Sequence, residues 1–231
     1  MNQYQLKSEK HSSSLVNERV IVGIIDYQSG NLHSAKKGVE KALGMSEKVA
    51  GEVRLVSSSD ELEDITHIIL PGVGAFYDCF SGLSKISGII ERMEEKVFND
   101  KCKFLGICVG MQILAERGYE KGEHKGLGWL KGLVIKIPNK QGDLKLPHMG
   151  WNEVTLRDKS SKLFGDIEDN SDFYFVHSYF MSADSHNILA EVDYGQQLTA
   201  AVLKDNIAGV QFHPEKSQIN GLKLLTNFVE W

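Results

Sequence analysis

Cysteine is scarce in this sequence of 231 residues, which contains only Cys79, Cys102 and Cys108. An odd and sparse set of thiols does not make a disulfide framework and is typical of proteins in a reducing compartment. Long apolar runs are also missing: no stretch approaches the roughly 18 consecutive apolar residues of a membrane span, and the polar first 19 residues contain no apolar core. We therefore expect no signal peptide, no membrane span and a cytoplasmic location.

Blocks of like charge are absent as well. The 26 basic and 31 acidic residues give a net charge of −5, spread along the chain, so there is no electrostatic argument for binding nucleic acid or an anionic membrane. The composition, with 42% hydrophobic and 25% charged residues, is typical of a globular protein. Because a domain has roughly 150 residues, we expect a single domain over residues 20–231, preceded by a polar N-terminal tail over residues 1–19.

Several motifs of common enzyme classes do not occur. The sequence has no Gly-Lys pair and therefore no P-loop, and it has neither a C-x-x-C nor an H-E-x-x-H string. No G-x-G-x-x-G string follows a predicted strand. ATP hydrolysis, zinc catalysis and dinucleotide chemistry thus lack their usual anchors, and we expect neither a metal nor a cofactor.

Apolar strands and amphipathic helices alternate in the first half of the chain. Asn31 can cap the first of these helices and Gly44 can end it. Predicted strands cover residues 20–25, 53–56, 67–70 and 103–107, and predicted helices cover residues 31–43, two stretches within 75–98, and 109–117. Such alternation predicts a parallel sheet with helices on both faces.

The second half contains mainly short strand-like runs. They cover residues 133–137, 151–156, 173–180, 188–192, 198–203 and 208–212. We expect them to extend the same sheet in an antiparallel or mixed manner, and we expect an amphipathic helix over residues 219–231 to dock on the domain. The predicted fold class is α/β, with an open, mixed, mostly parallel sheet flanked by helices and an antiparallel second half.

The string GICVGMQ (106–112) places Cys108 between two glycines at a strand-to-helix junction. This is the thiol version of the G-x-S-x-G nucleophile elbow, in which a strained turn lifts the nucleophile above the sheet edge. A helix N-terminus favours the thiolate, and the N–H of Val109 points toward a developing oxyanion. The alternative is a buried structural cysteine.

The string VQFHPEKS (210–217) supplies a proton carrier for such a thiol. His213 and Glu215 are two residues apart, so in extended backbone their side chains share one face. His213 can take and return a proton, while Glu215 fixes the ring's tautomer and stabilises its charged form. The alternative is a strand-end histidine beside a solvated glutamate.

A third string, ILPGVGAF (69–76), ends a predicted strand with two glycines. These glycines let the backbone reorient, so an N–H of Gly72 or Val73 can complete an oxyanion hole together with Val109. The alternative is a plain glycine-rich turn between a strand and a helix.

Together these strings resemble the class I (triad) glutamine amidotransferases. Four separated strings are more specific: PGVG (71–74), LPHMGWN (146–152), YFVHSY (174–179) and FHPEKS (212–217). They resemble the glutaminase subunits of imidazole glycerol phosphate synthase, and the resemblance covers nearly the whole chain from Val20 to Trp231.

The resemblance implies a flavodoxin-like fold and hydrolysis of L-glutamine through a γ-glutamyl thioester on Cys108. It also implies a heterodimer with a (βα)₈ cyclase subunit, which uses the ammonia to form imidazole glycerol phosphate in histidine biosynthesis. By position, the family's glutamine-binding residues correspond to Gly72, Gln112, Glu120, His177, Ser178 and Tyr179. Its partner interface corresponds to Asn31, Trp151 and Lys216. One position departs from the family, because Gln28 stands where a glycine is usual after the first strand.

Three other functions are compatible with parts of the sequence. A paralogue with the same active-site strings could feed ammonia to a different synthase, such as an enzyme that amidates a surface sugar. A hydrolase on the same scaffold could cleave γ-glutamyl or peptide bonds without a partner, although LPHMGWN argues against it. The chain could also be a silent binding subunit, against which Cys108, His213 and Glu215 argue.

Overall fold

The computed structural model describes residues 18–28, 31–139 and 142–231. The first strand, β1 (Glu18–Ile25), begins two residues before the predicted start of the domain. Residues 1–17 of the predicted tail lie outside the described residues.

Nine strands form the large sheet of the described residues. Their spatial order is β2 (Val49–Val56), β1, β3 (His67–Gly72), β4 (Lys103–Cys108), β13 (Ile207–Val210), β12 (Gln197–Lys204), β11 (Ile188–Asp193), β8 (His148–Leu156) and β9 (Ser171–His177). The pairs from β2 to β13 are parallel, and those from β13 to β9 are antiparallel. The predicted open mixed sheet is thus confirmed, with its parallel half built from the first strands of the chain and β13.

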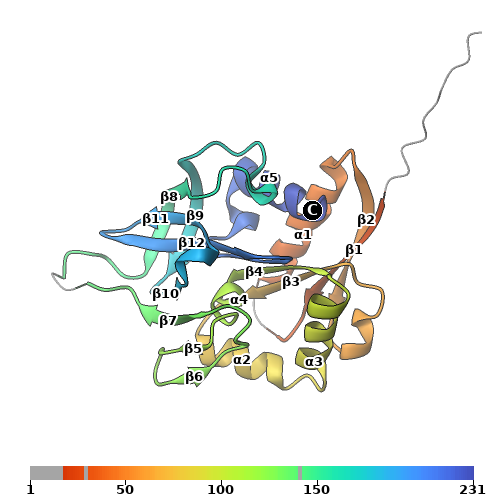
Figure 1. The fold of residues 1–231 in the computed structure, drawn as a ribbon, viewed down its shortest axis with the longest axis horizontal. Coiled ribbons are helices and arrows are strands. Elements are labelled where there is room, and N and C mark those ends of the chain that lie inside the picture. Colours follow the sequence, from red (N-terminus) through yellow and green to blue (C-terminus); the bar gives the residue numbers. More distant parts are fainter. Residues whose placement is uncertain (1–17, 29–30, 140–141) are drawn as a thin grey trace, which may run out of the picture.

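Helices cover both faces of the parallel half. They are α1 (Leu32–Met45), α2 (Phe76–Ser84), α3 (Ile89–Glu94), α4 (Val109–Gln112) and α5 (Gln218–Val229). Figure 1 shows α1 and α5 on one side of the sheet and α2 and α3 on the other. The predicted C-terminal helix therefore docks on the domain, next to α1.

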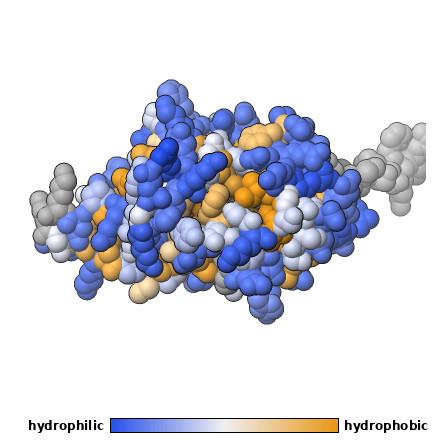
Figure 2. Space-filling model, turned by 90° about the horizontal axis from the view of Figure 1, so that it is seen from below, coloured by the Kyte–Doolittle hydropathy of each residue, from blue (hydrophilic) through white to orange (hydrophobic). Residues whose placement is uncertain are grey.

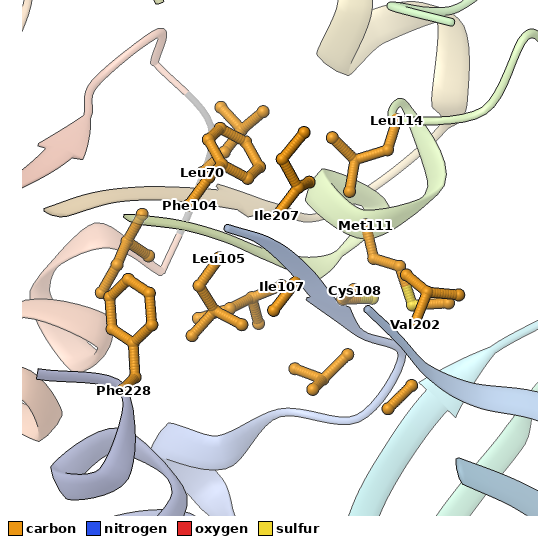
Figure 3. Close-up of a cluster of buried hydrophobic side chains, with 14 of the residues drawn as sticks. Leu70, Phe104, Leu105, Ile107, Cys108, Met111, Leu114, Val202, Ile207 and Phe228 are labelled. Carbon is orange, nitrogen blue, oxygen red and sulfur yellow. The ribbon is translucent and has the colours of Figure 1, made fainter. Parts of the chain in front are cut away.

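Burial follows this layering. Every residue of β3 is buried, as expected for a parallel strand covered on both faces. In β8, by contrast, the exposed residues Met149 and Trp151 alternate with less exposed ones, because one face of the antiparallel half is not covered by helices. The core continues to the edge of the sheet at Cys108, which lies beside Ile107 and Met111 in Figure 3.

One face of the molecule is mostly hydrophilic. Seen from below, hydrophilic residues cover most of the face, and hydrophobic ones gather near its middle (Figure 2). In the part of the chain that the structure describes, no helix is both long and apolar enough to cross a bilayer.

The prediction that all strands of the second half extend one sheet is wrong. A separate four-stranded sheet has the order β10 (Tyr179–Ala183), β7 (Gly132–Lys136), β5 (Arg117–Gly118) and β6 (His124–Lys125). The predicted strand over residues 173–180 is divided at Ser178, because the chain leaves β9 of the large sheet there and enters β10. Ser178 then lies between two sheets, where its carbonyl accepts a hydrogen bond from the N–H of Ile137.

The predicted helix over residues 109–117 is also too long. It ends at Gln112 because carbonyls that would continue it are used elsewhere. The Ile113 carbonyl accepts from the N–H of Leu127, and the Ala115 carbonyl accepts from the N–H of Gly128. The N-terminus next to Cys108 therefore belongs to a helix of four residues, shorter than the sequence predicted.

The ends of α1 differ from the prediction too. Asn31 occupies the N-cap position, but its φ of 78° is left-handed and its side chain makes no capping hydrogen bond. Gly44 lies within the helix, which ends instead at Met45 with Ser46 as C-cap. The Asn31 side-chain amide donates instead to Glu215.

Candidate active site

The three predicted motifs follow three neighbouring parallel strands. Residues of the Pro-Gly-Val-Gly string end β3, Cys108 ends β4, and His213 follows β13. Because parallel strands place their carboxyl ends at one edge of a sheet, segments far apart in sequence meet there. The register pairs Gly72 with Cys108 and Val210 with Ile107.

Cys108 makes the sharp turn that the sequence predicts. Its φ of 56° and ψ of −111° lie outside the usual regions for residues other than glycine. Such backbone strain costs about 1–3 kcal/mol and clusters at functional sites. The side chain is only 4% exposed, yet it lines a cavity.

Two glycines make this turn sterically possible. A Cβ on Gly110 would lie 1.8 Å from the carbonyl oxygen of Leu70, and one on Gly106 would lie 2.6 Å from the carbonyl oxygen of Gly110. The obstacles are backbone atoms, which cannot move aside as the end of a side chain can. Glycine is therefore required at both positions by close backbone approach.

We expect Gly110→Ala to lower the free energy of unfolding by about 3 kcal/mol or more, because overpacking against backbone cannot be relieved locally. Gly44→Ala is the matched control, since a Cβ there meets nothing within 4 Å. In a helix it should stabilise the protein by up to about 1 kcal/mol. Urea denaturation of both variants measures the difference. Equal stability of the two variants would contradict the steric argument.

His213 and Glu215 lie together and buried. The Glu215 Oε1 atom accepts a hydrogen bond from His213 Nδ1 at 2.8 Å and another from the side-chain amide of Asn31. Burial alone would lower the pKa of His213, but its interactions with the Cys108 and Glu215 side chains raise it to about 10. These two contacts therefore favour a charged imidazole. His213 Nε2 is buried with no hydrogen-bond partner of regular geometry among the described residues.

The cavity at this edge has a volume of about 410 Å³. Its lining residues are Val73, Gly74, Cys108, Val109, Gln112, Glu120, Pro147, Val176, His177, Ser178, Tyr179, His213 and Lys216. Most residues predicted to bind glutamine belong to this set, whereas Gly72 lies just behind it, pressed against Gly110. Within the described ranges, no group of three His, Cys, Asp or Glu side chains is arranged to hold a metal ion.

Side chains hold the glycine-rich string on both sides of the Gly72–Val73 peptide. The Tyr27 hydroxyl donates to the Pro71 carbonyl at 2.5 Å, and the Cys79 thiol donates to the Val73 carbonyl at 3.2 Å. The Pro71–Gly72 and Val73–Gly74 peptides are thus held by side chains, and the Gly72–Val73 peptide between them has the conformational freedom of glycine on one side.

Two predicted glutamine-binding residues also have structural bonds. Glu120 Oε2 accepts from the backbone N–H of Phe76, the first residue of α2. Gln112 is only 3% exposed, and its amide nitrogen donates to the Tyr179 carbonyl at 2.8 Å and to Gln211 Oε1 at 3.0 Å. Each side chain keeps a second oxygen or an unused lone pair that could accept a bond from a substrate ammonium or amide.

His177 belongs to a directional chain of hydrogen bonds. Its Nδ1 lies 3.0 Å from the Tyr179 carbonyl, which can only accept, so this nitrogen carries the proton. His177 Nε2 must therefore accept from His148 Nδ1 at 3.0 Å, and His148 Nε2 accepts from the Asn152 amide at 3.2 Å. Both rings are neutral in this arrangement, because a proton on either Nε2 atom would face a donor.

The free energy of unfolding should depend on pH below about 6.5 because of His148 and His177. Burial lowers the pKa of His148 to about 4 and that of His177 to about 3 from the usual 6.5. Unfolding thus takes up protons below pH 6.5, and stability falls as the pH decreases toward these values. We expect His177→Asn to remove about one proton from this uptake, which flattens the slope by roughly 1.4 kcal/mol per pH unit. Urea denaturation between about pH 6 and 4.5 measures the slope, and an unchanged slope would contradict the interpretation.

Two of the three residues predicted to meet a partner, Trp151 and Lys216, both contact Tyr174. Trp151 is 47% exposed and makes an edge contact with Tyr174. Lys216 lines the cavity and places Nζ 5.8 Å from the centre of the Tyr174 ring. Met149, on the same face of β8, is 65% exposed. Asn31, the third residue predicted to meet a partner, instead donates a hydrogen bond to Glu215 within the active site.

Gln28 has a backbone conformation that favours glycine. Its φ is 64°, in the left-handed region that favours glycine, and its N–H donates to the Asp26 side chain at 3.0 Å. The rest of this loop, residues 29–30, lies outside the described residues.

Sequence reasoning missed several residues of the site. Gln211 is fully buried and contacts Cys108, while Pro147 and Val176 line the cavity. Gln211 carried a signal, since it is a polar residue inside the apolar run AGVQF of a buried strand. Pro147, just before β8, and Val176, on β9, come together through the pairing of these two strands, which no local pattern shows.

Comparison with known proteins decides the family. Residues 24–231 match the family described as glutamine amidotransferase class-I. The chain belongs to the class I glutamine amidotransferases. It is therefore an enzyme of that class, and the fold agrees: a crystal structure of a glutamine amidotransferase aligns with a TM-score of 0.67 at 20% identity, covering 90% of this chain and 97% of that chain.

Curated relatives of this amidotransferase carry a narrower name. It is 46% identical over 211 residues to the imidazole glycerol phosphate synthase subunit HisH of Rhodospirillum rubrum, covering 91% of this chain and 98% of the relative. It is 44% identical over 214 residues to the subunit of the same name from Brucella suis, covering again 91% and 98%.

Proposed function

We propose that this amidotransferase is the glutaminase subunit of imidazole glycerol phosphate synthase in histidine biosynthesis. It hydrolyses L-glutamine to glutamate and ammonia, and it delivers the ammonia to a cyclase subunit. The observation that carries the proposal is the meeting of Cys108 and His213 at the wall of one cavity, with Glu215 hydrogen-bonded to His213, in a chain that matches HisH relatives over 91% of its length.

The first half of the reaction forms a thioester. The Cys108 thiolate attacks the side-chain amide carbon of glutamine, and the amide oxygen becomes an oxyanion. The C–N bond then breaks as the charged His213 donates its proton to the leaving nitrogen, so ammonia departs and the imidazole becomes neutral. Glu215 holds the ring in position through Nδ1 during this transfer.

The second half consumes one water molecule. Neutral His213 takes a proton from water through Nε2, and the resulting hydroxide attacks the γ-glutamyl thioester. Collapse of this second oxyanion breaks the C–S bond, releasing glutamate and restoring the thiolate beside a charged imidazole. No cofactor takes part in this proposal.

We assign the oxyanion hole to backbone N–H groups of Val109 and of Gly72 or Val73. The glycine-rich string supports this assignment, because Tyr27 and Cys79 hold the peptides on either side of Gly72–Val73. Docking of the cyclase and binding of its acceptor turn that central peptide and complete the hole. Glutamine is then consumed only when the ammonia can be used.

The partner is a (βα)₈ cyclase that forms a heterodimer with this chain in the cytoplasm. The aromatic side chains of Trp151 and Tyr174, with the neighbouring Lys216 that lines the cavity, are suited to contact it, and Met149 extends the apolar part of this surface. Gln112, Glu120, His177, Ser178 and Tyr179 are assigned to glutamine binding, with Gly72 behind them.

Glutaminase assays with and without the cyclase from the same genome test the proposal. One oxyanion-hole donor contributes about 10²- to 10³-fold in rate, so we expect ammonia release to rise by this factor in the complex with acceptor present. Equal rates would contradict the coupling to the partner but leave the nucleophile assignment standing. Failure to bind the cyclase, with activation by another synthase instead, would favour a paralogous role.

A further inference from the structure

Gln211 places a polar side chain against the nucleophile in an otherwise apolar part of the core. It follows β13 directly, next to the strand that ends at Cys108, and it is fully buried. Its Nε2 atom donates to Cys108 Sγ at 3.7 Å. A buried amide without partners is costly, so its contacts determine which end faces the sulfur.

The orientation of the Gln211 amide is fixed by the Tyr179 carbonyl, to which it is linked through the Gln112 side chain. The Tyr179 carbonyl can only accept, so it selects the NH₂ end of Gln112, which donates to it at 2.8 Å. The same nitrogen also faces Gln211 Oε1 at 3.0 Å. Gln211 must then present its own NH₂ end to Cys108, and the reverse orientation would set two donors against each other.

We propose that the Gln211 amide is a catalytic hydrogen-bond donor that stabilises the Cys108 thiolate and the charge that returns to sulfur when the thioester breaks. A donor aimed at sulfur favours the anion over the thiol, because hydrogen bonds to charged groups are stronger than those to neutral ones. Unlike His213, the Gln211 amide transfers no proton. The inference rests on the proposed role of Cys108 as nucleophile.

Alkylation of Cys108 by iodoacetamide as a function of pH tests this role in the isolated chain, with mass spectrometry to select the Cys108 peptide. Gln211→Leu removes the donor, and Gln211→Glu keeps the shape but faces the sulfur with an acceptor. We expect the midpoint of the pH dependence to rise by about one unit in Gln211→Leu and by more in Gln211→Glu. Gln196→Leu is the matched control, because the side chain of this glutamine donates to the Pro138 carbonyl and does not line the cavity, and its midpoint should equal that of the wild type.

Wild-type midpoints in both folded Gln211 variants would overturn the proposal and leave Gln211 as a packing residue. If neither variant folds, the side-chain amide resonance of Gln211 in the wild-type chain gives the answer by NMR. It should move with the same pH midpoint as the alkylation rate, and a resonance that stays constant across that midpoint would equally overturn the proposal. Because alkylation requires neither glutamine nor the cyclase, its outcome is independent of whether the glutaminase proposal holds.

Discussion

Replacement of Cys108 by alanine is expected to lower glutamate release by more than about 10⁴-fold, because the reaction loses its only nucleophile. The loss should appear in kcat. Assay of the variant in complex with the cyclase measures it, so that lack of activation cannot be the cause.

Cys102→Ala is the matched control for this substitution. Its thiol is also buried, at 5% exposure, but burial raises its pKa to about 12, and its sulfur contacts the Ile65 carbonyl at the other end of the sheet. We expect wild-type glutamate release from this variant. Undiminished release from Cys108→Ala, with the control behaving as expected, would remove the proposed mechanism.

Glu215→Gln is expected to lower kcat by about 10³- to 10⁴-fold with little change in KM, as loss of the carboxylate does in other triads. Glu215 Oε1 accepts from both His213 and Asn31, and Oε2 is buried with no partner among the described residues. The amide has one acceptor for two donors and lacks the charge that stabilises the imidazolium. The His213 ring is then no longer held in one tautomer, and its charged form is less stable.

The control for charge removal is Glu230→Gln. Glu230 is a largely buried carboxylate, 12% exposed, that binds Lys48 and Ser46 far from the cavity. Its loss should lower stability slightly and leave kcat unchanged. A similar loss of kcat in both variants would mean that the Glu215 effect is structural.

The predictable part of this protein is the part encoded in local strings. Cys108 between close-packed glycines and the His213–Glu215 pair were assigned from sequence because strand ends, turn residues and spacing are local properties. Their meeting at one edge also followed, since parallel strands share an edge. The contact of Asn31 with Glu215 did not follow, because Asn31 matches a helix cap equally well by pattern alone.

The unpredicted part depends on contacts between distant segments. The division of residues 173–180 at Ser178 cannot be read from the alternation of apolar residues, because both halves alternate in the same way. The early end of α4 results from the segment around Leu127, which takes carbonyls that a helix would otherwise use. Gln211 acquires its orientation only through Gln112 and Tyr179, which come from other elements.

The most direct measurement is a rapid acid quench of the complex during turnover of isotopically labelled glutamine, followed by peptide mapping. A γ-glutamyl thioester on the peptide containing Cys108 is the predicted result, and it should be absent from Cys108→Ala. Glu215→Gln should slow both the formation and the hydrolysis of this thioester. Active turnover with no label on the Cys108 peptide would contradict covalent catalysis at this sulfur.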